Sequence, residues 1–324
     1  MTNTILSADN LVKRFAPKTR LDAPVIAVNN VSFGLRNGEV TALIGESGSG
    51  KTTIARILTG LDQPTSGTVV WENSAELSRK ALQQRVQMVF QDPFAALNPM
   101  NLIGYTVSRP LINYRRIARA QVNDEVIRLL EAVQLTPGSA YISKRPYELS
   151  GGQRQRVVIA RALAASPQVI VADEPVSMLD VSIRSEILRL LRSVMENQGV
   201  QSMLYITHDL LSAQLVADQV LVLYRGHIVE RGETGEILQH PLHPYTQLLM
   251  DSIPNPWRRQ EPRRRVSQTT PSTSSHGCPY APHCPLAAKQ CWSLPAPVVD
   301  RPGGGKVACF AVHDGRAVEQ ARNH

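Results

Sequence analysis

Apolar residues along this chain form short continuous runs, which are separated by longer stretches where they recur at helical spacing. Continuous runs are typical of strands buried on both faces of a parallel sheet, and helical spacing is typical of amphipathic helices. The runs predict strands at 39–44, 169–172, 202–207 and 220–224. Because strand and helix signals alternate, the pattern predicts an α/β domain with a mostly parallel sheet covered by helices.

The helical spacing extends from about 104 to 165, a stretch with few strand signals. The positions that define one helix face include Val126, Leu129, Leu130 and Val133. We therefore expect a helical subdomain, at about 96–165, inserted into the α/β core. A helix at 154–165 is expected to end this insertion, and a helix at 241–253 is expected to close the core.

The composition changes after residue 257. Residues 258–276 are rich in Arg, Ser, Thr and Pro, which is typical of a linker, and residues 277–324 contain all four cysteines. We expect an α/β domain at 1–257, this linker, and a Cys-rich extension. The extension is too small to bury a core of its own, so it needs a metal, a covalent bridge or a docking surface.

The formal net charge of +8 is concentrated in the last part of the chain. Residues 1–257 contain 25 basic and 23 acidic side chains, whereas residues 258–324 contain 10 and 4. Five basic residues crowd one segment: Arg258, Arg259, Arg263, Arg264 and Arg265. Such a segment is typical of a solvated linker, and it is also suited to contact with anionic lipid headgroups or nucleic acid.

The chain is 43% hydrophobic, which excludes a disordered protein. It contains no uninterrupted apolar stretch of the roughly 18 to 20 residues that a membrane helix needs. The first residues also lack the basic and apolar regions of a secretory signal. We expect a cytosolic protein whose association with a membrane is peripheral.

A glycine-rich segment follows the first predicted strand and leads into a helix. Its sequence, Gly45-Glu46-Ser47-Gly48-Ser49-Gly50-Lys51-Thr52, fits the phosphate-binding pattern G-x-x-x-x-G-K-[ST]. In this pattern consecutive backbone N–H groups and the helix start hold phosphates, the lysine reaches the β- and γ-phosphates, and the hydroxyl binds Mg²⁺. The alternative is a glycine-rich turn without a ligand.

Two carboxylates, Asp173 and Glu174, end the apolar run that begins at Val169. The carboxyl ends of strands are where α/β folds bind ligands. Asp173 is suited to a metal shell, and Glu174 to orienting or deprotonating a water that attacks the γ-phosphate. Alternatively, both are acidic caps of the next helix.

One further segment and two single residues are also candidates for a binding or catalytic site. Leu149-Ser150-Gly151-Gly152-Gln153 precedes a helix, with Ser150 as its N-cap, which suggests a second anion site or simply a tight helix entry. His208 follows a predicted strand, where a structural hydrogen-bonding role is the alternative. Gln91 follows another apolar segment at the junction with the helical insertion.

Taken together, these segments resemble the nucleotide-binding subunits of ATP-binding-cassette (ABC) transporters over nearly the whole chain. That resemblance implies a P-loop NTPase (RecA-like) core with added antiparallel strands, the helical insertion and the Cys-rich extension. It also implies that the signature segment 149–153 of one subunit clamps the nucleotide held by another. The chain is accordingly expected to be an ATPase that dimerises around ATP and Mg²⁺.

The resemblance assigns roles to individual residues. Glu174 is implied as the catalytic base, His208 as the residue that bridges water and γ-phosphate, and Gln91 as a sensor that also contacts the metal. Thr52, Gln91 and Asp173 are implied as Mg²⁺ ligands. Phe15 matches the aromatic residue that stacks on adenine, and Asp180 belongs to the D-loop Ser177-Met178-Leu179-Asp180. The full set implied in nucleotide binding is Phe15, Gly45, Glu46, Ser47, Gly48, Ser49, Gly50, Lys51, Thr52, Thr53, Ser150, Gly151, Gly152, Gln153 and Asp180.

Finer likenesses are to the branch that imports dipeptides and oligopeptides, with nickel and oligosaccharide importers as relatives. They lie in the segment 91–99, in His243-Pro244-Tyr245-Thr246 and in the cysteine tail. The implied partners are a second ATPase subunit, as a heterodimer or a homodimer, two integral-membrane permease subunits and an extracytoplasmic solute-binding protein. The implied location is the cytoplasmic face of the inner membrane.

Two other classes of protein compete with this interpretation. A soluble ABC ATPase acting on nucleic acid usually has two cassettes or a long coiled coil, whereas only 97 residues separate Thr52 from Ser150. A P-loop kinase or GTPase would not use the signature or His208. We therefore expect no nucleic-acid partner.

The four cysteines, Cys278, Cys284, Cys291 and Cys309, are predicted to ligate one metal centre. Their gaps of five, six and seventeen residues lack the short spacings typical of structural zinc, whereas four thiolates suit a [4Fe–4S] cluster. Disulfides are disfavoured in the cytosol. Zinc and free thiols remain the alternatives.

Overall fold

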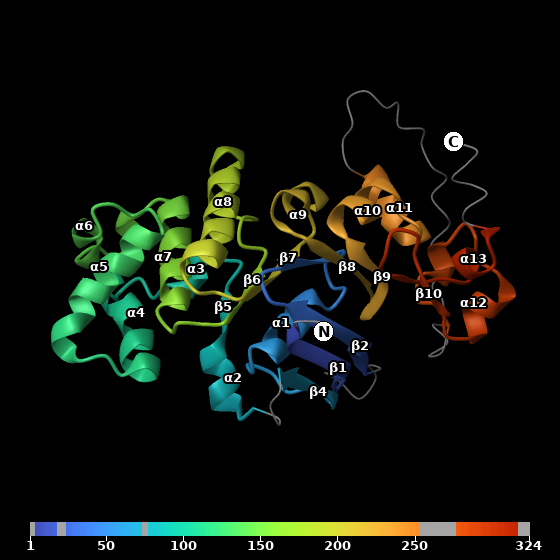
Figure 1. Ribbon diagram of the computed structural model, residues 1–324, viewed down its shortest axis with the longest axis horizontal. Coiled ribbons are helices and arrows are strands. Elements are labelled where there is room, and N and C mark those ends of the chain that lie inside the picture. The colour runs from blue at the N-terminus through green and yellow to red at the C-terminus, as the bar shows by residue number, and fades with distance from the viewer. Residues whose placement is uncertain (1–3, 18–23, 73–76, 253–276, 317–324) are drawn as a thin grey trace.

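The computed structural model describes residues 4–17, 24–72, 77–252 and 277–316. The linker predicted at 258–276 lies outside these residues. Along its longest axis, the described chain runs from a helical region through a central α/β core to the cysteine-containing extension (Figure 1).

The centre of the molecule is an eight-stranded mixed sheet. Its strands in spatial order are β10 (Val298–Asp300), β11 (Lys306–Ala308), β9 (His227–Glu233), β8 (Gln219–Tyr224), β3 (Val40–Ile44), β7 (Ser202–Thr207), β6 (Val169–Asp173) and β5 (Val86–Val89). The five strands from β8 to β5 pair in parallel, whereas β9, β11 and β10 pair antiparallel. The sheet is therefore mostly parallel where the predicted phosphate and carboxylate residues end its strands.

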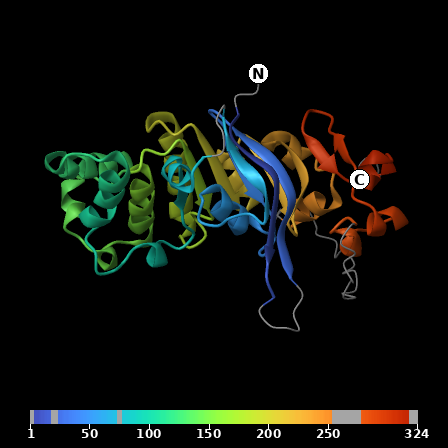
Figure 2. The same ribbon diagram turned by 90° about the horizontal axis from the view of Figure 1, so that it is seen from below.

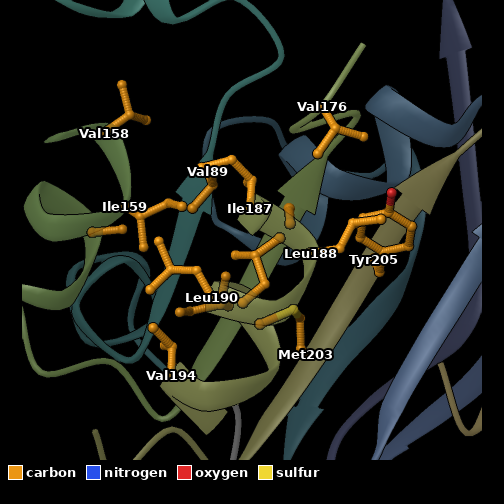
Figure 3. Close-up of a cluster of buried hydrophobic side chains, with 14 of the residues drawn as sticks. Val89, Val158, Ile159, Val176, Ile187, Leu188, Leu190, Val194, Met203 and Tyr205 are labelled. Atoms are coloured by element: carbon orange, nitrogen blue, oxygen red, sulfur yellow. The ribbon is translucent and has the colours of Figure 1, made fainter. Parts of the chain in front are cut away.

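Both faces of the parallel strands are buried, which explains their continuous apolar runs. On β6, Ile170 and Ala172 contribute to one hydrophobic cluster and Val169 and Val171 contribute to the other. The first cluster, part of which Figure 3 shows, contains side chains of the helical region and of α8 (Val181–Asn197). The second contains side chains of α1 (Lys51–Leu58) and of a separate antiparallel sheet. One face is thus covered by helices, and the other by helices and by the strands of the antiparallel sheet.

The antiparallel sheet has three strands in the order β2 (Val25–Arg36), β1 (Thr4–Phe15) and β4 (Ser66–Trp71). Figure 2 shows β1 and β2 as a long ribbon beside the core. This sheet supplies the antiparallel elements that the family resemblance implied. The apolar pattern alone, which led us to expect helices as the cover, did not predict these strands.

The helical region lies between β5 and β6 in the chain and forms one end of the molecule (Figures 1 and 2). Its elements are α3 (Pro93–Ala96), α4 (Ile103–Pro110), the π-helical η1 (Leu111–Arg115), the 3₁₀ turn η2 (Arg119–Gln121), α5 (Val122–Ala132), α6 (Ser139–Ile142), the 3₁₀ turn η3 (Pro146–Glu148) and α7 (Gly151–Leu163). On α5, Val126, Leu129 and Leu130 are buried. The predicted helical insertion is therefore present.

The remaining helices cover the core or belong to the extension. They are α2 (Arg79–Arg85), α9 (Leu210–Val216), α10 (Thr234–Gln239), α11 (Pro244–Asp251), the 3₁₀ turn η4 (Ala281–His283), α12 (Lys289–Ser293) and α13 (Phe310–His313). The extension docks on the core, because β11 pairs with β9 and the buried side chain of Tyr280 joins the first hydrophobic cluster. In the part of the chain that the structure describes, no helix is long and apolar enough to cross a membrane.

Candidate functional site

The glycine-rich loop lies between β3 and α1, at the carboxyl end of a central strand. A Cβ atom at Gly45 would collide with the carbonyl oxygen of Leu223 on β8, and one at Gly50 would collide with that of Ala27 on β2. Gly50 also has a φ of +107°, which disfavours any residue with a side chain. The loop is therefore confined between two strands at the N-terminus of α1, an arrangement suited to binding anions.

The side chains of the loop differ in exposure. Glu46, Ser47 and Gly48 are exposed, and Thr53 is half-buried in the first turn of α1. Ser49 is buried, and its Oγ has no hydrogen-bond partner among the residues that the structure describes. An unpartnered buried hydroxyl fits a ligand that supplies its own oxygen atoms.

Lys51 points back into the loop from the start of α1. Its side chain is buried, and its Nζ donates to the carbonyl oxygens of Gly45 at 2.7 Å and of Glu46 at 2.8 Å. Burial lowers the pKa of Lys51, while the nearby carboxylates of Glu174, Asp173 and Glu46 act to raise it. The loop therefore holds a cation beside the two acidic residues that end β6.

Thr52 lies beside Asp173, where its hydroxyl acts to lower the pKa of the Asp173 carboxyl. Burial raises the pKa of Asp173, and its Oδ1 is buried without a partner among the described residues. A hydroxyl and an unsatisfied carboxylate oxygen beside a phosphate-binding loop are the donor types that Mg²⁺ prefers. The residues present therefore fit a magnesium ion.

Glu174, Gln91 and His208 meet at the carboxyl ends of β6, β5 and β7. The Oε2 of Glu174 accepts a hydrogen bond from Gln91 Nε2 at 3.0 Å and lies 3.2 Å from His208 Nδ1. The Glu174 side chain is 16% exposed and that of His208 is 59% exposed, so the carboxylate is recessed and the imidazole faces solvent. The three residues predicted as catalytic thus form one cluster, in which Gln91 contacts Glu174.

The backbone at Glu174 is strained, with a φ of +44° that few residues with side chains adopt. Its N–H donates to the carbonyl oxygen of Ile206, which fixes this conformation. A small pocket of about 50 Å³ opens beside Glu174 and His208. It is large enough for a water molecule, which needs roughly 10–15 Å³ of such volume. The strained backbone, held by this hydrogen bond, therefore places the Glu174 carboxylate at the wall of a pocket that can hold a water molecule.

The signature segment lies at the start of α7, in the helical region. Ser150 Oγ accepts a hydrogen bond from Gln153 N, and the Gln153 side chain accepts one from Ser150 N. This capping box begins the helix at Gly151, so the helix start expected at 154 is wrong by three residues. A Cβ at Gly152 would lie 2.8 Å from the Ile183 side chain, which explains why glycine is needed there.

Ser150 is exposed, and α7 lies in the helical region, whereas the phosphate-binding loop leads into α1 beneath the central sheet (Figures 1 and 2). The D-loop also faces solvent: Met178 is 56% exposed, and Asp180 is exposed at the N-cap position of α8. Ser177 instead donates to the carbonyl oxygen of Glu174. These two segments therefore present groups to solvent rather than to the phosphate-binding loop of the same chain.

Phe15, predicted to stack on adenine, ends β1 and is 41% exposed. It is paired across the strands with Val25, two residues before Ala27, which contacts Gly50 of the phosphate-binding loop. The Nζ of Lys13 lies 5.3 Å from the centre of the Phe15 ring. Phe15 is therefore an available aromatic surface on the strand pair that borders the loop.

All four cysteines lie in the extension, and all four are free. Burial, together with the charges of the other cysteines, raises the pKa of Cys278 to about 11 and that of Cys284 to about 12. Among the described residues, however, no group of three or more His, Cys, Asp or Glu side chains has a geometry that could hold a metal ion. The four predicted ligands therefore form no metal site within the described part of the chain.

Sequence reasoning assigned no role to three residues that the structure places beside the site. The hydroxyl of Tyr245 accepts a hydrogen bond from Glu46 N in the phosphate-binding loop. Arg154 on α7 lies over the Phe94 ring at 4.4 Å, and Arg161 Nη1 donates to the carbonyl oxygen of Ala96 at 2.6 Å. The arginines link the segment after Gln91 to the signature helix. The only sequence signal was the position of Arg161 within an apolar run.

Two family models match the chain. A model described as "ABC transporter" matches residues 28–177, and one described as "Oligopeptide/dipeptide transporter, C-terminal region" matches residues 229–291. A probable peptide ABC transporter ATP-binding protein of Sinorhizobium fredii is 39% identical over 321 residues, covering 95% of this chain and 90% of that protein. The dipeptide transport ATP-binding protein DppF of Escherichia coli is 37% identical over 320 residues, covering 95% and 94%.

Solved structures agree with these similarities. The ATP-binding cassette MJ0796, solved as a post-hydrolysis dimer bound to ADP and Pi, matches with a TM-score of 0.62 and 29% identity, over 71% of this chain and 99% of that one. The cbiO1 protein of Clostridium perfringens, part of the ABC transporter complex cbiONQ, matches with a TM-score of 0.63 and 28% identity, over 74% and 92%.

Proposed function

The chain belongs to the ATP-binding subunits of ABC transporters, in the oligopeptide and dipeptide branch, and from this premise we propose that it powers the import of dipeptides or oligopeptides through membrane permeases. The observation that carries the proposal is the meeting of Glu174, Gln91 and His208 beside the cation of Lys51. Such a cluster next to a phosphate-binding loop is suited to hydrolysis of a bound triphosphate.

Binding of ATP is assigned to the loop and its surroundings. The backbone N–H groups of residues 45–53 and the Lys51 ammonium hold the phosphates, and Phe15 stacks on the adenine. Thr52 and Asp173 would hold Mg²⁺, with Gln91 close by. When bound, the magnesium ion offsets negative charge on the β- and γ-phosphates.

Hydrolysis is assigned to the cluster at the ends of β6 and β7. Glu174 orients a water in the adjacent pocket and accepts its proton at the carboxylate as the water attacks the γ-phosphate. The bond between the γ-phosphorus and the β–γ bridging oxygen breaks, and ADP leaves. His208 contacts the attacking water and the γ-phosphate, and Gln91 holds the Glu174 carboxylate in place. The fold already places the side chains of Gln91 and His208 next to the Glu174 carboxylate, as these roles require.

We propose that a complete site needs two subunits. At the start of α7, Ser150 is exposed, Gly151 and Gln153 are half-buried, and Gly152 is buried. These four residues would bind the nucleotide held by a second ATPase subunit, with the exposed Asp180 at the same interface. Two exposed apolar side chains of the D-loop region, Met178 and Val181, support the presence of a protein partner there. A heterodimer and a homodimer are both compatible with this arrangement.

Changing Ser150 to Phe is expected to block the ATP-bound dimer and to lower hydrolysis per chain by about tenfold, while nucleotide binding to the monomer persists. The loss corresponds to about one charge-assisted hydrogen bond to phosphate. The measurement is hydrolysis per chain against protein concentration, which should rise in the unchanged protein until dimers saturate.

The matched control for this experiment is Ser143→Phe, which changes an exposed serine elsewhere in the helical region. That variant should behave as the unchanged protein does. Concentration-independent hydrolysis by a proven monomer would contradict the shared site.

The permease partners are expected to contact an apolar surface next to Gln91. Its exposed side chains are Phe94, Met100, Leu102 and Tyr105. The contacts of Arg154 with Phe94 and of Arg161 with Ala96 connect this surface to the signature helix.

We accordingly place the protein peripherally on the cytoplasmic face of the inner membrane, with two permeases and an extracytoplasmic solute-binding protein in the complex. Purifying the complex from membranes and identifying the bound cargo tests peptides against nickel and oligosaccharides.

In the extension, we propose that Cys278, Cys284, Cys291 and Cys309 ligate one [4Fe–4S] cluster. The proposal rests on four soft sulfur donors within one small extension, two of which, Cys291 and Cys309, are buried. Metal binding would require the side chains to move into ligand geometry and the thiols to lose their protons.

Protein purified without oxygen is expected to be brown, to absorb broadly near about 400 nm, and to lose this colour in the Cys284→Ser variant. His283→Gln, at the neighbouring position, serves as the control and should keep the colour. Colourless protein with one zinc per chain would assign the other metal, and metal-free protein with four titratable thiols would contradict the centre.

A further inference from the structure

One hydrogen bond connects the phosphate-binding loop to α11, which is the closing helix expected at 241–253 and spans Pro244–Asp251. The backbone N–H of Glu46 donates to the hydroxyl of Tyr245 at 3.1 Å. On the other side of the same residue, the carbonyl oxygen of Glu46 accepts from Lys51 Nζ. The peptide groups on both sides of Glu46 are therefore held by hydrogen bonds, which fix the orientation of the backbone directly after Gly45.

Tyr245 is rigidly held. Its side chain is fully buried, and its ring centre lies 4.5 Å from that of Tyr224 on β8. At the start of α11 the backbone N–H of Tyr245 donates to Nδ1 of the buried His243, which caps the helix. Because ring and backbone are both fixed, the hydroxyl is presented to Glu46 at a set position.

The extension contributes a third ring, that of Tyr280, to an aromatic cluster with Tyr224 and Tyr245. Tyr280 lies between Cys278 and Cys284 and is 4% exposed, with its ring centre 5.5 Å from Tyr245 and 5.2 Å from Tyr224. The extension is anchored to the core by a buried ion pair, in which Arg301 Nε lies 3.2 Å from Glu230 Oε1. It is also anchored by the pairing of β11 with β9.

We propose that Tyr245 is a positioning residue for nucleotide binding, whose hydroxyl sets the Glu46 peptide of the phosphate-binding loop, and that the extension holds Tyr245 in place through Tyr280. The proposal rests on the proposed nucleotide-binding role of residues 45–53. It gives the cysteine-containing extension a physical route to the nucleotide, although the extension lies beyond the closing helix.

The Tyr245→Phe variant removes the hydroxyl and keeps the ring. We expect binding of a fluorescent ATP analogue to weaken about fivefold, with a similar rise in KM for MgATP and a nearly unchanged kcat, because one neutral hydrogen bond that shapes the ground-state site is lost. Tyr224→Phe is the matched control: it removes a hydroxyl from the adjacent ring and leaves the bond to Glu46 in place.

Loss of affinity in Tyr245→Phe but not in Tyr224→Phe supports the proposal. Equal losses in both variants would assign the effect to packing of the cluster and overturn it. Unchanged binding and KM in Tyr245→Phe, with only a lower Tm, would also overturn it, because a purely structural residue moves stability alone.

Tyr280→Leu tests the link to the extension by replacing the ring with a smaller apolar side chain. We expect about a threefold loss of affinity for the ATP analogue, since an aromatic contact of this kind orients its neighbour. The double variant Tyr245→Phe, Tyr280→Leu should bind no more weakly than Tyr245→Phe alone, because both changes act through the same hydroxyl. Independent, multiplying losses would show that Tyr280 acts elsewhere and would overturn the link.

The unchanged protein separates this proposal from the proposed function. If it binds no ATP analogue at all, the nucleotide-binding role of residues 45–53 fails. If it binds the analogue and Tyr245→Phe binds equally well, only the positioning role of Tyr245 fails.

Discussion

Glu174→Gln is expected to bind ATP as the unchanged protein does and to hydrolyse it about 100-fold more slowly or worse, the contribution typical of a general base. Glutamine keeps the size and shape of the side chain and retains an oxygen that accepts from Gln91 Nε2. What it lacks is a carboxylate that can take a proton from water. The change thus separates the chemical role of Glu174 from its structural role.

The measurement for this variant is phosphate release at saturating MgATP, together with equilibrium binding of ATP. Glu186→Gln is the control, because Glu186 pairs with Arg156 on the outside of α8, and it should hydrolyse at the normal rate. Hydrolysis by Glu174→Gln at half the normal rate would remove Glu174 from the catalytic role.

Lys51→Ala is expected to weaken ATP binding itself, by about 100-fold, which is the effect of losing a charge-assisted contact to phosphate. The substitution also removes both bonds from Nζ to the loop carbonyls and takes away the Lys51 charge that interacts with Asp173 and Glu174. Uncompensated carboxylates repel a triphosphate, which adds to the loss. We expect little change in Tm, because removing a buried ammonium also removes its desolvation cost.

Binding of a fluorescent ATP analogue, with and without Mg²⁺, measures the Lys51→Ala effect. Lys80→Ala on the exposed face of α2 is the matched control. Affinity within threefold of normal in Lys51→Ala would show that the phosphates lie elsewhere. Together with Glu174→Gln, this variant distinguishes loss of the phosphate site from loss of the catalytic step.

The central strands and the loop between them were predictable from sequence because both faces of the sheet are buried. Burial on two faces produces continuous apolar runs, so the strand predicted at 202–207 agrees with β7, and that at 169–172 differs from β6 by one residue. The ends of these strands fixed where Asp173, Glu174 and His208 would lie. Their convergence follows from parallel pairing alone.

The start of α7 and the antiparallel strands were less predictable. Gly151 and Gly152 have low helix propensity, but the capping box between Ser150 and Gln153 draws both into the first turn. The 12-residue strands β1 and β2 contain several register shifts, which interrupt the alternation that would reveal them. The local pattern of apolar residues does not predict helix starts that depend on side-chain caps, or strands that β-bulges interrupt.

The link from Tyr245 to Glu46 joins residues 199 positions apart, and no local signal predicts it. The same holds for the pairing of β11 with β9, which depends on how the extension docks. Sequence reasoning recognised the phosphate-binding loop and the cysteines as separate motifs. Only the fold shows that a single aromatic cluster lies between them.

The pairing of β11 with β9 also protects the sheet. Without the extension, β9 would become an edge strand whose free N–H and C=O groups offer a template for strands of other molecules. Glu230 would at the same time lose Arg301, leaving a buried carboxylate without its counter-ion. A chain shortened after the closing helix would therefore be prone to aggregation. The extension covers the edge of β9 and so prevents edge-to-edge association of sheets, whatever its cysteines bind.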